Sequence, residues 1–452
     1  MIQLSDHFSY KKLLKFTIPS IAMMIFTSIY GVVDGFFVSN FAGDIPFKAV
    51  NLIMPFLMIL GTVGFMFGTG GTAIVAKTFG EKDSKRANEY FSLFVYVTFI
   101  LGLFFAVLGI IFMPQVASLL GAKGAILENA IIYGRIILMA LPFLVLQFLF
   151  QSFFVAAEKP KMGLYVTLAA GITNMVLDAV LVLLLPINYK LIGAAIATAS
   201  SQTIGGLIPL IYFLSKNKSI LRIGKTKFYG KAIIKACING SSEFMSNVSM
   251  NLVGMLYNLQ LLKYLGDNGI AAYGVMMYVS MIFASTFIGY SIGSSPVISY
   301  HDGAKNYSEL KNVLKRSLII IGISGIIMIV LGILLARPLA YIFVSYSPEL
   351  MDITIKGFRI FAISFPFMGF AIYGSSFFTA LNDGVTSAII SFLRTLVFQI
   401  GAVLLLPLLW KENGIWLSVV VAEIMAVVFT FIFMIAKRKK YHYSGKSKNI
   451  NV

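Results

Sequence analysis

The chain has 452 residues, of which 58% are hydrophobic and 12% charged, and its mean hydropathy is +0.89. This composition excludes a water-soluble fold of this length and indicates an integral membrane protein. With one cysteine and three histidines, and a formal charge of +18, the sequence predicts neither a disulfide framework nor a metal cluster.

Apolar stretches long enough to cross a bilayer follow one another along the chain. The first runs on directly from Lys15, so the N-terminus is not expected to be a cleavable signal peptide. The fold class that we predict is an all-α polytopic membrane protein with twelve transmembrane helices. They are expected at 13–41, 47–76, 88–120, 127–157, 162–186, 190–215, 232–264, 268–300, 312–336, 351–381, 384–409 and 413–436.

Lys and Arg concentrate in the tails and in the loops on one side of the predicted membrane span. Because cytoplasmic loops are enriched in these residues, both termini are expected in the cytoplasm. The densest basic stretch, residues 216–235, lies between the sixth and seventh helices. Topology and contact with anionic lipid explain these charges, so membrane lipid is the expected partner and nucleic acid is not.

The sequence repeats itself when it is shifted by 223 residues, which places Gly31 on Gly254 and Asp44 on Asp267. Six helices recur, and an even number means that both halves cross the membrane in the same sense. We therefore predict two parallel-repeat lobes with the substrate site between them. The expected units are an N-terminal six-helix lobe (1–215), a basic cytoplasmic linker (216–231), a C-terminal six-helix lobe (232–436) and a basic cytoplasmic tail (437–452).

Four polar residues of the first lobe are the candidate cation site: Asp34, Asn174, Asp178 and Thr198. Asn174 and Asp178 share a helix face, and the helical rise puts Asp34, Asp178 and Thr198 roughly 10 to 12 Å below the outer surface. No Lys or Arg is expected at that level, so a mobile Na⁺ or proton would neutralise the carboxylates. The alternative is that these groups only join helices.

The second lobe lacks this arrangement, because Tyr257 stands at the position of Asp34 and Ala402 at that of Asp178. Its seventh helix instead carries a polar stripe on one face, at spacings of four, four and seven. The stripe comprises Glu243, Asn247, Asn251 and Asn258.

Two further features lie within predicted helices. Arg394 and Glu423 fall near the bilayer midplane, where a structural ion pair is the least costly arrangement. Pro19 removes a backbone hydrogen bond from the first helix and gives it a place to bend below Asp34. We hypothesise that ion binding shifts helix 1 between straighter and more bent forms, although a fixed kink is an equal alternative.

Several stretches together resemble the multidrug and toxic compound extrusion (MATE) transporters: GTGGTAIVAKTFGEKDSKRAN, AAEKPKMGLYVTLAAGITNMVLDAVLV, IGAAIATASSQ and GSSPVISYHDGAKNYSELKN. The resemblance implies export of organic cations in exchange for Na⁺ or H⁺. It maps the family's first-lobe cation site onto Asp34, Asn174, Asp178 and Thr198, and it includes a proline at Pro19. Some relatives carry an acidic residue deeper in the seventh helix than Glu243.

We therefore expect multidrug efflux by cation antiport with alternating access, acting on small amphipathic or cationic substrates. The alternative is a lipid or lipid-linked oligosaccharide flippase of the same superfamily. An enzyme is not expected, because no nucleophile with a base lies at membrane depth. No cofactor is expected besides the coupling ion, and the monomer should be functional. We expect this protein in the plasma (inner) membrane of a bacterium.

Overall fold

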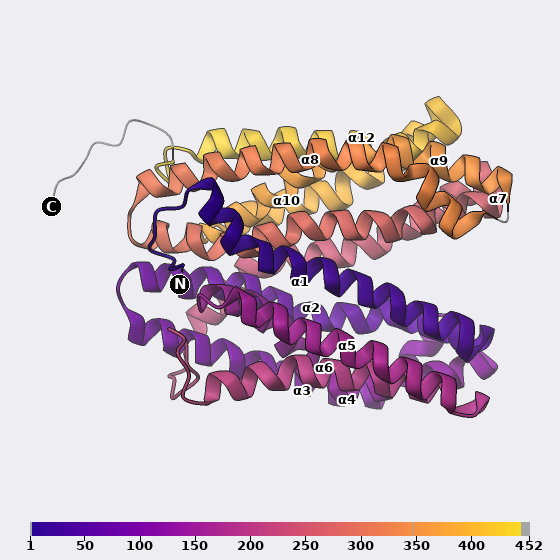
Figure 1. Ribbon diagram of the computed structural model, residues 1–452, viewed down its shortest axis with the longest axis horizontal. Coiled ribbons are helices and arrows are strands. Elements are labelled where there is room, and N and C mark those ends of the chain that lie inside the picture. Colours follow the sequence, from indigo (N-terminus) through magenta and orange to yellow (C-terminus); the bar gives the residue numbers. More distant parts are fainter. Residues whose placement is uncertain (1, 346, 444–452) are drawn as a thin grey trace.

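The computed structural model describes residues 2–345 and 347–443, so most of the predicted basic tail lies outside the described residues. All regular elements of the described part are helical, as the sequence predicted (Figure 1). They are α1 (Tyr10–Phe37), η1 (Val38–Ala42), α2 (Asp44–Gly80), α3 (Ser84–Leu119), α4 (Gly124–Ala156), α5 (Pro160–Leu184), η2 (Ile187–Tyr189), α6 (Lys190–Leu214), α7 (Gly230–Gly303), α8 (Tyr307–Val344), α9 (Pro348–Ala362), α10 (Phe365–Ala380), α11 (Gly384–Phe392), η3 (Leu393–Phe398) and α12 (Gln399–Lys437).

The length of α7 conceals two membrane spans. Gly266 has a φ of 62° and interrupts the helix, a left-handed conformation that glycine adopts without steric cost. Tyr257 and Tyr273 stack at 5.2 Å on either side of this break, so the chain doubles back there. The predicted helices at 232–264 and 268–300 are therefore the two arms of one hairpin.

Two other breaks complete the count. In α12, Trp410 and Lys411 leave helical geometry, and Ser418 donates to the Ala402 carbonyl across the turn at 3.0 Å. α9 and α10 form one span bent by 48° just before Pro366, whose ring cannot continue a helix hydrogen-bond ladder. When α7 and the stretch from α11 to α12 are each counted as two spans, and α9 with α10 as one, the described residues hold the twelve predicted spans.

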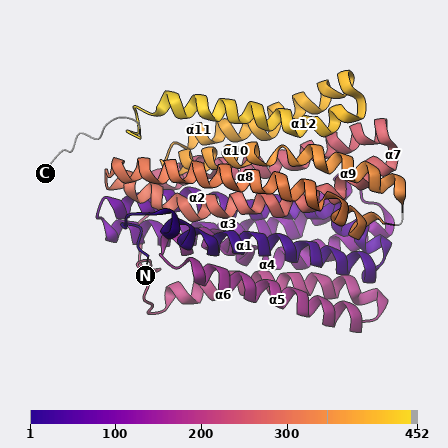
Figure 2. The ribbon, with the colours of Figure 1, turned by 45° about the horizontal axis from the view of Figure 1, so that its top comes forward.

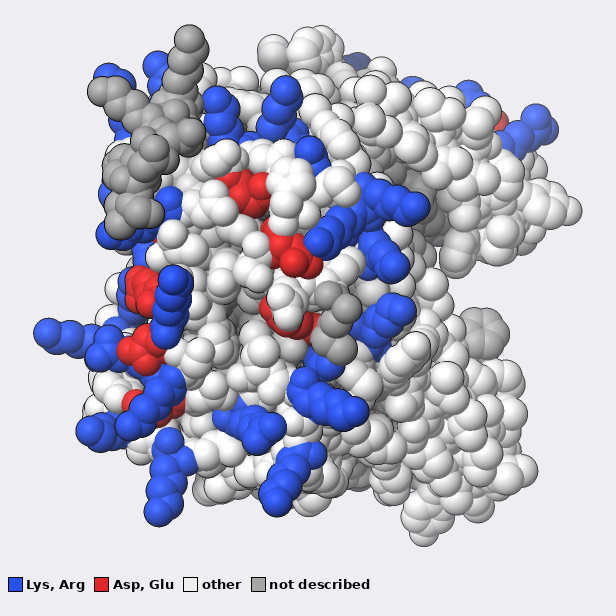
Figure 3. Space-filling model, turned by 60° about the vertical axis from the view of Figure 1, so that its left-hand side comes forward, with Lys and Arg blue, Asp and Glu red and all other residues white. Residues whose placement is uncertain are grey.

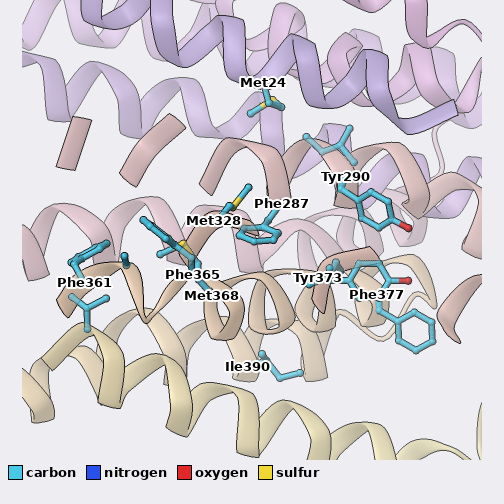
Figure 4. Packing of buried hydrophobic residues seen from close by; sticks show 14 of the residues in the cluster. Met24, Phe287, Tyr290, Met328, Phe361, Phe365, Met368, Tyr373, Phe377 and Ile390 are labelled. Atoms are coloured by element: carbon cyan, nitrogen blue, oxygen red, sulfur yellow. The ribbon is translucent and has the colours of Figure 1, made fainter. Parts of the chain in front are cut away.

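The buried apolar side chains form two large clusters. One is built from α2, α3, α4 and their neighbours, between Val38 and Ala236. The other contains the C-terminal helices together with the start of the chain, from Leu4 to Met24. Figure 4 shows part of it, where Met24 of α1 faces Phe287 and Tyr290 of α7. Thus α1 begins in the C-terminal core and ends beside the N-terminal one.

The two clusters meet most closely at the end of the bundle where α1 begins and α12 ends (left in Figure 1), which we call the basic face. A Cβ on Gly70 of α2 would lie 2.7 Å from the Gly240 nitrogen of α7, and one on Gly80 would lie 2.7 Å from the Ala304 nitrogen. The helix backbones are therefore in direct contact there. Lys77 of α2 also pairs with Asp302 of α7 at 2.7 Å.

Toward the opposite end, the helices of the two clusters separate. A Cβ placed on Gly31 or Gly35 of α1, or on Gly254 or Gly274 of α7, would meet nothing within 4 Å. Figure 2 shows the same helices from a second angle, with α1 and α2 between α5 and α6 on one side and the C-terminal helices on the other. The close backbone contacts between α2 and α7 are therefore found at the basic face, and these four glycines make none.

The residues before α1 link both clusters at the basic face. The Leu4 N–H donates to Glu158 Oε1 at 2.7 Å, and the Phe8 N–H donates to Glu309 Oε1 at 2.8 Å. Glu158 follows α4 and Glu309 begins α8, so this segment spans the two groups of helices. Burial raises the pKa of Glu158 from its ordinary value, despite the opposing effect of the Leu4 N–H.

Lys and Arg gather over the basic face, as Figure 3 shows, and they enclose a few paired acids. Asp383, the N-cap of α11, accepts from Lys437 Nζ and from the Tyr441 hydroxyl, both at 2.8 Å. Burial acts to raise its pKa, but these donors outweigh burial and hold the pKa of Asp383 below its ordinary value. The end of α12 is thereby fastened to the start of α11.

Candidate cation site

The predicted first-lobe residues come together between α1, α5 and α6. Asp34 lies near the end of α1, just before the π-helical turn η1, and its side chain is buried. The Thr198 hydroxyl of α6 donates to Asp34 Oδ1 at 3.0 Å. This bond joins two helices that are far apart in the sequence.

α5 supplies the other two groups, one helical turn apart. Asn174 and Asp178 are 1% and 0% exposed, and both lie beside the Asp34 carboxyl. Apart from their interaction with the Asp34 carboxyl, neither the Asn174 amide nor the Asp178 carboxyl has a hydrogen-bond partner among the described residues. Polar atoms that are buried without a partner are costly. These buried polar groups are therefore a candidate binding site for a cation or a proton.

The site has no fixed counter-ion. Within the described part of the chain, no Lys, Arg or His forms an ion pair with Asp34 or Asp178. Two carboxyls, an amide oxygen and a hydroxyl form an all-oxygen set, the ligand type that hard cations prefer. The residues present therefore fit Na⁺, and either carboxyl can alternatively hold a proton.

One residue that the sequence analysis missed lies near this site. Tyr133 of α4 is close enough to Asp34 and Asp178 for their charges to act on it, and its hydroxyl is buried without a hydrogen-bond partner among the described residues. Further along α4, the side-chain amides of Gln147 and Gln151 are also buried without a partner there. They lie 14 and 18 residues from Tyr133, about 21 and 27 Å along the helix, and so belong to another level of the membrane.

The corresponding place in the second lobe has no carboxyl at either repeat position, since these are Tyr257 and Ala402. The Tyr257 hydroxyl donates to Gln399 Oε1 at 2.9 Å, and the Tyr257 ring stacks on Tyr273. Ala402 is buried and accepts a hydrogen bond only through its backbone carbonyl, from Ser418. These contacts are complete without an ion.

The predicted polar stripe on α7 has members in different surroundings. Glu243 and Asn247 are half-buried, and the Asn247 amide donates to the Glu243 carbonyl at 2.9 Å. Asn258 is exposed. The side chain of Asn251 lies outside what the structure describes. The structure thus brings only Glu243 and Asn247 together.

Arg394 and Glu423 are in contact, with Arg394 Nε at 3.0 and 2.8 Å from the two Glu423 oxygens. Their side chains are 15% and 3% exposed. Pro19 is buried in α1, and the helix continues through it without a break. Neither feature takes part in the first-lobe site.

A repeated twelve-helix bundle with buried polar groups at membrane depth defines a membrane transporter of the two-lobe type. The family model MatE matches residues 19–180 and 244–404, so the chain belongs to the MatE family. The two matched ranges correspond to the two copies of the sequence repeat.

Individual relatives agree over nearly the whole chain. The multidrug export protein MepA of Staphylococcus haemolyticus is 25% identical over 432 residues, covering 95% of this chain and 94% of the relative. MepA of Staphylococcus aureus strain MRSA252 is 24% identical over 439 residues, with the same two coverages. A structure of the outward-facing conformation of a multidrug resistance MATE family transporter superimposes with a TM-score of 0.90 at 21% identity, covering 97% and 98% of the two chains.

Proposed function

We propose that this protein exports small amphipathic or cationic compounds by antiport with Na⁺ or H⁺. The observation that carries the proposal is the site formed by Asp34, Asn174, Asp178 and Thr198, which has two buried carboxyls and no counter-ion in the described chain. The names of the MepA relatives support drug export. No cofactor other than the coupling ion is required, and one chain is the functional unit.

The proposed location is the plasma membrane of a bacterium, with both termini in the cytoplasm. The relatives come from Staphylococcus, and the basic face (Figure 3) carries the positive charge typical of cytoplasmic loops. In this orientation the close contacts between α2 and α7 lie on the cytoplasmic side.

The proposed coupling follows from charge. Asp34 and Asp178 cannot both ionise cheaply in a dry environment, so a proton or Na⁺ must accompany at least one of them. Binding reduces the repulsion between α1 and α5 and so favours tighter packing of these helices. Pro19 gives α1 a weak point at which such a change produces a bend. Occupancy by the inward-moving ion would then favour release of substrate.

The test is dye export from proteoliposomes under separate Na⁺ and H⁺ gradients. Asp34→Asn and Asp178→Asn remove charge with little change in volume, and each should lower coupled export about tenfold or more, since the loss of a charged ligand costs at least about 1.5 kcal/mol. Asp44→Asn is the matched control, because Asp44 is exposed and pairs with Lys48. Export by either site variant at the rate of Asp44→Asn would refute the proposal.

A further inference from the structure

A groove of about 260 Å³ lies at the basic face, between the first turns of α7 and those of α11. The two helices touch at its base, because a Cβ on Gly384 would lie 2.5 Å from the Ile238 carbonyl oxygen and from the Asn239 Cα. Ala236 of α7 is buried in the N-terminal core, and Leu381, just before α11, is buried in the C-terminal core. The groove therefore follows the junction between the two cores.

The amides and the acid of this groove already have partners within the protein. Asn239 Nδ2 donates to Asn382 Oδ1 at 2.9 Å, and Asn382 Nδ2 donates to the Ala73 carbonyl at 3.2 Å. Asp383 also lines the groove, but its carboxylate is occupied by the ion pair with Lys437 at 2.8 Å. These groups therefore leave no unbalanced negative charge for a cationic ligand.

Two lysines give the groove an unbalanced positive charge. Lys231 and Lys235 both line it and lie one helical turn apart, so they share a face of α7. Neither forms an ion pair with any residue that the structure describes. Both side chains are exposed and can reach a ligand in the groove. The polar part of the groove is therefore suited to an anion.

The outer walls of the groove are apolar. Ile234 and Ile238 of α7 and Val385 of α11 line it, and they are 61%, 44% and 59% exposed. Ile389 lies one turn beyond Val385, continues the same face of α11 toward the middle of the membrane and is also exposed. A contiguous exposed apolar surface of this kind marks a contact with lipid or with another molecule. The groove thus combines two cationic groups at its cytoplasmic end with an apolar furrow that runs into the bilayer.

From this arrangement we propose that the groove binds one anionic phospholipid of the cytoplasmic leaflet. Lys231 and Lys235 hold its phosphate, and an acyl chain lies along Ile238 and Ile389. A soluble anion would use the lysines but leave the apolar walls uncovered, and a zwitterionic lipid would bring its own cation close to the two ammonium groups. An anionic lipid matches both parts of the groove and contacts both cores at once. This site is independent of the proposed export function.

Quenching by brominated lipid provides the test. Bimane is attached to the full chain carrying Cys237→Ser and Ile389→Cys, where it reports bromine atoms on neighbouring acyl chains. The protein is reconstituted into phosphatidylcholine vesicles in which a rising fraction is dibrominated phosphatidylglycerol, with dibrominated phosphatidylcholine as the neutral reference. We expect the anionic lipid to bind about 25-fold more tightly than the neutral one, since each lysine near the membrane surface contributes about fivefold.

Two double variants assign this preference to residues. Lys231→Gln with Lys235→Gln should bring the ratio of the two affinities close to one, because it removes both charges from the groove. Lys225→Gln with Lys227→Gln is the matched control, since it removes the same charge from exposed positions in the linker just before α7. The control should keep the preference. All four side chains are exposed, so neither variant should impair folding.

Three results would overturn the proposal. The first is no anionic preference in the chain that keeps all four lysines. The second is an equal loss of preference in both double variants, which would show that the charge of the whole basic face attracts the lipid. The third is displacement of brominated phosphatidylglycerol by inorganic phosphate, with chloride at the same ionic strength having no effect, which would identify a site for a soluble anion.

Discussion

Gly240→Ala should force the basic face open, because this glycine permits the closest contact between α2 and α7. A Cβ there would lie 2.6 Å from the Met66 carbonyl carbon and 2.8 Å from its Cα, whereas ordinary contacts begin at 3.4 Å. These are backbone atoms and cannot rotate away, so the helices must separate. Overpacking of this kind costs about 1 to 3 kcal/mol. The population of the closed form relative to the open form should therefore fall by about fivefold to 150-fold.

Spin labels report this change directly. Lys85 of α3 and Lys315 of α8 are exposed on the two sides of the basic face. Once the single native cysteine, Cys237, is replaced by Ser, a cysteine introduced at each of these two positions can carry a spin label. Gly240→Ala should shift the distance distribution between the labels to longer values. Gly254→Ala is the matched control on the same helix, because its Cβ would meet nothing within 4 Å. Identical distributions for the two variants would show that the backbone contact does not hold the face closed.

Three further predictions concern other parts of the molecule. Tyr257→Phe should leave the ion dependence of export unchanged, and a shift as large as that of Asp34→Asn would mean that the second lobe also couples. Thr198→Val removes one hydrogen bond to Asp34 and should weaken Na⁺ or H⁺ dependence about threefold to tenfold, as measured by ion titration of export. Asp383→Asn should lower the free energy of unfolding by about 1 kcal/mol at pH 7. Because the folded-state pKa of Asp383 is lowered, this difference from wild type should persist above about pH 4 and shrink as the pH falls further. Thermal melts in which the difference between variant and wild type does not change with pH would refute this prediction.

The sequence alone predicted the features that depend on helical periodicity and on depth in the membrane. Asp34, Asp178 and Thr198 could be placed at one level because the helical rise is constant and each segment end is marked by polar residues. The turn at Gly266 was expected between two apolar stretches. The surroundings of each side chain could not be predicted in the same way. The spacing of the α7 stripe only places its members on one helix face, whereas packing against neighbouring helices leaves Asn258 exposed and Glu243 half-buried.

Packing between distant segments was not accessible from the sequence pattern. Nothing in residues 4–24 indicates that they join the C-terminal core, because any apolar helix face can cover any other. The contact of Arg394 is a similar case. The sequence predicts an ion pair with Glu423, but only the geometry shows that the contact is made through Nε.

The starts of α1 and α7 are exchanged between the two cores, since Leu13 of α1 is buried in the C-terminal core and Ala236, its counterpart in the repeat, is buried in the N-terminal core. Leu4, Phe8, Leu13 and Phe16 are buried in the C-terminal core, although they belong to the first half of the chain. If the first half were synthesised alone, these side chains would have no partner surface. A circular permutation that placed the second repeat first would have to carry this segment along with it. Each half therefore needs the first turns of the other half's leading helix to complete its own core.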